Sequence, residues 1–84
     1  MPKFIDYHEK APMLPPEVVG QMVAAIKAGK PNELGVTPIN LFMGAGGQAY
    51  CLSEAPNAEA VCQMHAAVGV PINAKDVVEV QSLV

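Results

Sequence analysis

The sequence predicts an α+β fold in which strands and helices follow one another in the order β-α-β-β-α-β. Three observations support it. Side chains alternate between the two faces of a strand near both ends of the chain, and two segments have apolar residues at helical spacing. A glycine-rich turn separates two central strands. Right-handed crossovers place both helices on one face of a four-stranded antiparallel sheet. We expect residues 1–84 to form one domain, because a chain of 84 residues buries a single small core.

The first strand is predicted at residues 3–8, where aromatic and β-branched residues are frequent. A helix follows from Pro16, a residue that suits the first helical turn, and ends at Gly29. The apolar residues of this helix recur with the spacing of one buried face. We expect them all to lie in the core: Val19, Met22, Val23 and Ile26.

The second half of the chain predicts a hairpin, a helix and a last strand. The hairpin has strands at 39–43 and 48–54, joined by the turn Gly44-Ala45-Gly46-Gly47. A strand follows this turn, so the helix N-terminus that a phosphate-binding loop requires is missing. Asn57 is suited to cap a helix that ends near Val68, and the last strand is predicted at 77–80.

Composition restricts the partners. The net charge is −3, and the five lysines are scattered without a single arginine, so we expect no nucleic-acid partner. No apolar run approaches the roughly 20 residues of a membrane span, so we expect no membrane partner and a cytoplasmic location. In that compartment Cys51 and Cys62 are expected to be free, inert thiols rather than a disulfide.

Asp6 and His8 are the most informative polar residues, because strand alternation places both on the same face. We expect Tyr50, Glu54 and Glu79 to share the helix-free face with them. Side chains of neighbouring strands on one face can converge on one ion at distances of about 2.0–2.2 Å. Solvated strand ends or an ion pair at a subunit interface are the alternative interpretation.

His65 is a further candidate ligand, because it lies three residues after Cys62 on the second predicted helix. Residues at this spacing share a helix face and offer imidazole and thiolate donors. Two ligands alone make a poor metal site. The alternative is a packed thiol and a histidine whose ring nitrogens bond nearby backbone.

The run Tyr50-Cys51-Leu52-Ser53-Glu54-Ala55-Pro56-Asn57-Ala58-Glu59-Ala60-Val61, followed by His65, and the opening Phe4-Ile5-Asp6-Tyr7-His8 resemble a family of small bacterial proteins. This family is a domain of unknown function with nickel-binding members. The resemblance covers most of the chain. It implies a ferredoxin-like fold, a homodimer, and nickel or another divalent transition metal held by histidine and carboxylate side chains.

The leading hypothesis is therefore a small, non-enzymatic binding protein that takes a transition metal on the helix-free face of its sheet. A bare apolar sheet face in a small chain favours packing against a second copy, as in a dimeric α+β barrel. Fold analogy offers a second hypothesis, an oxygenase or isomerase with a small organic substrate, with His8 as base and Tyr50 or Glu54 orienting the substrate. A plain interaction module is the third.

Overall fold

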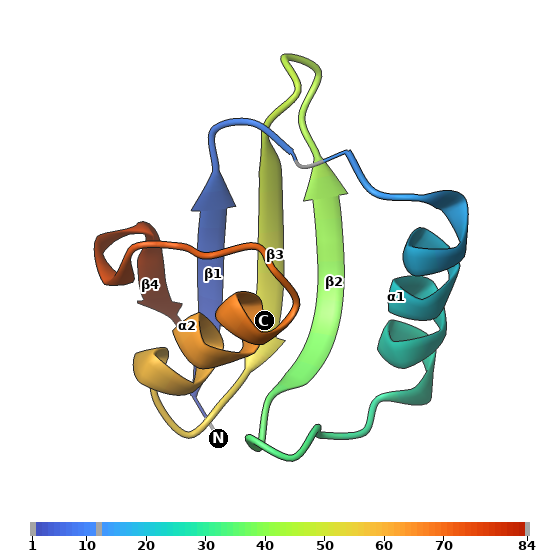
Figure 1. Cartoon of the computed structure of the whole chain (residues 1–84). Helices are drawn as coiled ribbons and strands as arrows, with labels where there is room; N and C mark the ends of the chain where they lie inside the picture. The colour runs from blue at the N-terminus through green and yellow to red at the C-terminus, as the bar shows by residue number, and fades with distance from the viewer. Residues whose placement is uncertain (1, 12, 84) are drawn as a thin grey trace.

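A computed structural model of the chain describes residues 2–11 and 13–83. Its elements are, in chain order, β1 (Lys3–His8), α1 (Pro16–Ala28), β2 (Thr37–Met43), β3 (Ala49–Glu54), α2 (Ala58–Ala67), the short 3₁₀ helix η1 (Ala74–Asp76) and β4 (Val77–Val80). Figure 1 shows this arrangement, which confirms the predicted α+β, ferredoxin-like order of strands and helices.

The four strands form one antiparallel sheet in the order β2-β3-β1-β4. β1 pairs with β3 on one side and with β4 on the other. Residues of β1 therefore have neighbours on both sides, and their side chains on the helix-covered face are shielded by adjacent strands. This central position makes β1 a suitable element for holding a buried polar group.

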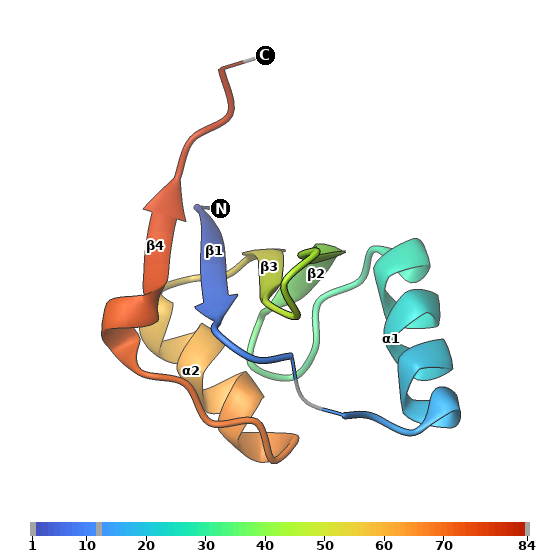
Figure 2. The ribbon, with the colours of Figure 1, turned by 90° about the horizontal axis from the view of Figure 1, so that it is seen from above.

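Helix α2 lies across the face of the sheet, as the view from above shows (Figure 2). Its start is fixed by Asn57, whose side-chain oxygen accepts a 2.8 Å hydrogen bond from the amide of Ala60. Val61 is fully buried in α2 and joins a core cluster that extends from the helix to the sheet and the adjacent loops. That cluster consists of Phe4, Val36, Ala55, Ala60 and Val61.

Helix α1 lies beside β2 at the edge of the sheet (Figure 2). None of its residues, all of which the structure describes, is buried. Val19 and Val23 are 45% and 44% exposed, and Met22 and Ile26 are half-buried. The prediction that this stripe lies in the core is therefore wrong. Helical spacing identifies an apolar side of a helix, but it does not identify what that side packs against.

The strand register assigns side chains to the two faces of the sheet. Asp6 is paired with Cys51 and Tyr7 with Tyr50, and paired residues of antiparallel strands share a face. Asp6 and His8 therefore lie under α2 together with the core residue Phe4. Their predicted place on the helix-free face is wrong. Phe4 alternates in phase with Asp6 and His8, and its bulky apolar side chain is the sequence signal that this face of the strand is covered.

Tyr50 and Glu54 do lie on the helix-free face, where they are paired with Tyr7 and Lys3. Glu79 is paired with Phe4, so it shares a face with Asp6 but is exposed. The predicted group of five polar residues on one open face is thus divided between two faces. The register, which the sequence does not fix, is the reason.

Among the described residues, no helix is long and apolar enough to cross a membrane. The longest, α1, has 13 residues, whereas a membrane span needs about 20. The cytoplasmic location stays a prediction.

Candidate metal centre

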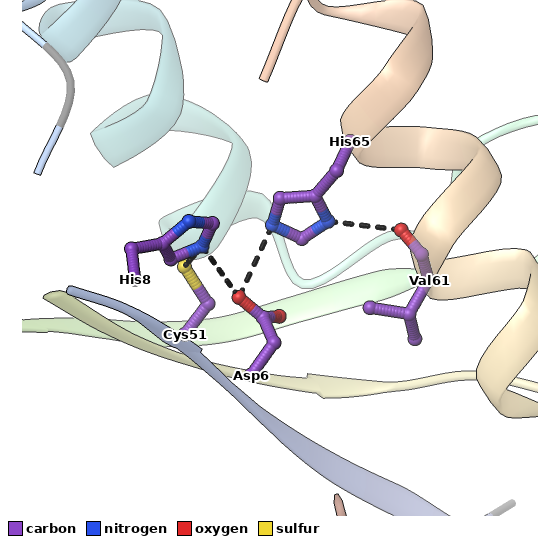
Figure 3. A network of polar contacts seen from close by, with 5 residues as sticks. All are labelled: Asp6, His8, Cys51, Val61 and His65. Carbon is purple, nitrogen blue, oxygen red and sulfur yellow. Dashed lines mark hydrogen bonds and ion pairs between the residues drawn. The ribbon is translucent and has the colours of Figure 1, made fainter. Parts of the chain in front are cut away.

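Four potential metal ligands converge between the sheet and α2 (Figure 3). Asp6 and His8 come from β1, Cys51 from β3 and His65 from α2. One donor atom from each residue lies within 4.8 Å of the donor atoms of all the others. Strand β1 and the consecutive elements β3 and α2 therefore deliver a carboxylate, a thiol and two imidazoles to one small volume, here called the ligand cluster.

Asp6 is at the centre of the ligand cluster and is 0% exposed. Its Oδ1 lies 2.7 Å from Nε2 of His8 and 3.2 Å from Nε2 of His65. Its Oδ2 has no hydrogen-bond partner among the residues that the structure describes. A buried carboxylate oxygen without a partner is costly, and a bound cation is one way to compensate it.

His65 is oriented by its own helix. Its Nδ1 lies 2.9 Å from the carbonyl oxygen of Val61, which only accepts hydrogen bonds, so Nδ1 donates (Figure 3). Nε2 is thereby aimed at Asp6. A histidine fixed through one ring nitrogen by a backbone carbonyl, with the other nitrogen directed inward, is the usual arrangement of a metal-ligating histidine.

The charge of Asp6 changes how His65 titrates. Burial alone lowers the pKa of His65, but the hydrogen bonds to Asp6 and to the Val61 carbonyl and the negative charge of Asp6 outweigh burial, and the pKa is raised. The imidazolium form of His65, which pairs with Asp6, therefore persists to higher pH than that of an ordinary histidine. A metal ion would have to displace this proton to reach Nε2.

Cys51 completes the ligand cluster from β3, with its Sγ 3.7 Å from Nε2 of His8. Burial, the charge of Asp6 and a hydrogen bond to Asp6 together raise the pKa of the thiol to about 12. Such a thiol is a poor nucleophile at neutral pH, because the thiolate is the reactive form. A metal ion reverses this situation, since a coordinating thiol is deprotonated.

The geometry of His8 does not match a catalytic relay. In a cysteine-histidine-aspartate triad, the thiol and the carboxylate contact opposite nitrogens of the imidazole. Here the same atom, Nε2 of His8, faces both Oδ1 of Asp6 and Sγ of Cys51. The donor atoms are directed toward a common point and not along a chain of proton transfers.

Of the ligands predicted from the sequence, the structure brings together Asp6, His8 and His65. Glu54 and Glu79 are outside the ligand cluster, and Tyr50 lies on the opposite, helix-free face of the sheet. Cys51 was missed as a ligand, although its predicted position under the helices is the one observed. The cluster thiol is Cys51, whereas the predicted helical pair used Cys62. Once Asp6 is placed on the helix-covered face, its direct cross-strand partner Cys51 follows as a candidate ligand.

Comparison with known proteins identifies the family of the chain. The family described as nickel responsive protein SCO4226-like matches residues 4–80. The crystal structure of SCO4226 from Streptomyces coelicolor A3(2) is similar, with a TM-score of 0.70 and 28% identity over 98% of this chain and 99% of that chain. Among curated proteins, none matches. The chain belongs to the SCO4226-like family of nickel responsive proteins.

Proposed function

We propose that the protein binds a divalent transition metal ion, nickel in particular, at Asp6, His8, Cys51 and His65. One observation carries the proposal: four donor atoms from three elements lie within 4.8 Å of one another around a buried carboxylate. The name of the family supports nickel as the ion. Under this proposal, the protein is a metal-binding protein and not an enzyme.

The chemistry of the donor set fits such an ion. Imidazole nitrogen and thiolate sulfur are ligands of nickel, zinc and copper, whereas calcium and magnesium prefer oxygen alone. The Asp6 carboxylate and the Cys51 thiolate together carry two negative charges, which balance those of a divalent cation. A buried ion that is neutralised by its ligands avoids much of the penalty for burying charge.

Calorimetric titration of nickel into tag-free protein tests the proposal. We expect one ion per chain for the unmodified protein and much weaker binding for Cys51→Ser, because the hydroxyl is a poor substitute for a thiolate. Cys62→Ser is the matched control, since Cys62 is also half-buried but lies outside the ligand cluster. Unchanged binding by Cys51→Ser, or no binding by the unmodified protein, would contradict the proposed site.

We further propose that the helix-free face of the sheet packs against a second copy of the chain. Its exposed residues include Tyr7, Tyr50, Phe42 and Val78, which are 37–55% exposed, and the two tyrosine rings lie 5.3 Å apart. Large contiguous apolar faces are uncommon on monomers, and a two-fold interface uses one face twice. Light scattering checks this: Tyr50→Glu should shift a dimer toward monomer, and a monomeric unmodified protein would exclude the interface.

A further inference from the structure

An open cleft of about 590 Å³ lies beside the ligand cluster. One wall comes from the end of β1 and the residues after it, and the other from the segment between α2 and β4, which crosses in front of the strands (Figure 1). His8 is the member of the ligand cluster that lines this cleft. The cleft therefore leads from solvent to one of the four ligands.

His8 lies between the cleft and the buried carboxylate. Its side chain is only 8% exposed, and its Nε2 lies 2.7 Å from Oδ1 of Asp6, whose side chain is 0% exposed. An ion that arrives through the cleft therefore meets the imidazole of His8 before it meets Asp6.

The charges on the cleft favour a cation. Glu9 and Asp76 contribute two carboxylates, and Lys10 is the one ammonium group among the described lining residues. A cleft with an excess of one sign of charge raises the local concentration of ions of the opposite sign and accelerates their capture. This effect acts on the rate of binding more than on the final affinity.

We propose that metal ions enter and leave the ligand cluster through this cleft, with His8 as the first ligand, Glu9 and Asp76 attracting the ion and Lys10 opposing it. The inference rests on the proposed metal binding. It adds a route, and it assigns a kinetic role to three charged residues that do not hold the ion.

Stopped-flow mixing with nickel at low ionic strength tests the charges. We expect the double variant Glu9→Gln, Asp76→Asn to capture nickel about tenfold more slowly than the unmodified protein. The matched control is Glu17→Gln, Glu33→Gln, which removes the same charge from exposed positions outside the cleft. The control should capture nickel at nearly the original rate, and Lys10→Gln should capture it faster.

A bulky substitution tests the route itself. Asn73 is exposed, lines the cleft and makes no side-chain cap to η1, so Asn73→Trp narrows the cleft without removing a cap. We expect capture and release to slow by the same factor, because an obstructed path changes the barrier and not the two end states. The equilibrium affinity for nickel should stay unchanged.

The outcomes separate the route from the proposed function. If the unmodified protein binds nickel, but Asn73→Trp and the Glu9, Asp76 double variant load at the original rate, the route is wrong and the metal site stands. A slower rate in the Glu17, Glu33 control equal to that of the cleft variant would also overturn it, since the effect would then come from net charge. If the unmodified protein binds no nickel at equilibrium, the metal site fails and the route with it.

Discussion

The two helices have similar amphipathic sequences but different relations to the sheet. α2 buries Ala60, Val61 and His65, whereas α1, although three residues longer, has no buried residue. α2 supplies two core residues and a candidate ligand, and α1 lies at the edge of the sheet with Val19 and Val23 exposed. The difference indicates that the stability of the fold and the proposed function both depend on α2.

α2 can serve both the core and the ligand cluster because of one of its residues. Val61 has two roles: its side chain is fully buried in the core, and its carbonyl accepts the hydrogen bond from Nδ1 of His65. Packing and ligand orientation therefore share one helical turn. α1 has no equivalent residue, so changes in α1 should leave the ligand cluster unaffected.

The largest expected difference is in metal affinity. His65→Ala removes a proposed ligand on α2, and since loss of an outer-shell partner already costs about 10–100-fold in affinity, we expect a loss of at least about 100-fold. Calorimetry with nickel measures it. Gln63→Ala is the control, because Gln63 is exposed on the same helix. Comparable affinities for the two variants would break the link between α2 and the site.

Core packing should distinguish the helices next. Val61→Ala opens space beside Phe4 in the core cluster, and we expect a loss of about 2 kcal/mol in the free energy of unfolding. Val23→Ala on the exposed side of α1 should change it by less than about 0.5 kcal/mol. Urea denaturation of both variants gives the values. A large loss for Val23→Ala would mean that another surface covers α1 in solution.

Capping is expected to have a smaller effect. Asn57→Ala removes the hydrogen bond to the amide of Ala60 and should reduce the free energy of unfolding by about 1 kcal/mol. α1 begins after Pro15, which provides no side-chain cap. Urea denaturation checks the prediction, with Asn57→Asp as the variant that restores most of the loss. An unchanged midpoint in Asn57→Ala would contradict it.

The smallest expected effect is a pH dependence, because burial opposes the influence of Asp6 on His65. The pKa of His65 is raised above its ordinary 6.5 in the folded state. The stabilisation is therefore complete below the ordinary pKa and is lost as pH rises through the folded value. We expect the metal-free protein to lose stability as pH rises above 6.5, and His65→Gln to lose less.

Urea denaturation at a series of pH values measures the effect. The pH should stay below the ordinary thiol pKa of 9.0, so that the cysteines of the unfolded chain do not contribute. Equal pH profiles for the two proteins would show that the ion pair of Asp6 with His65 contributes nothing to stability.

Much of this structure follows from local sequence signals. Pro16, Gly29 and Asn57 mark helix ends that the structure confirms, and the glycine turn marks the hairpin. What does not follow is long-range geometry. The same spacing at Val19 and Val23 that indicates a helix carries no information about its neighbour, and alternation divides β1 into two faces without saying which one α2 covers.

The site illustrates the same limit. Asp6, His8 and His65 were recognisable from residue type, because carboxylates and histidines are common ligands. Cys51 was not, since a cysteine under a helix is usually a packed thiol. Its role depends on the pairing of Asp6 with Cys51, two residues 45 positions apart in the sequence, and only the register of the strands determines that pairing.

The most direct test of the proposed metal site is the anomalous difference map of a crystal grown with nickel. We predict one strong peak per chain between the sheet and α2, about 2.0–2.3 Å from the donor atoms of Asp6, His8, Cys51 and His65. A peak elsewhere on the chain, with Asp6 still paired to His65 at the 3.2 Å seen here, would contradict the account.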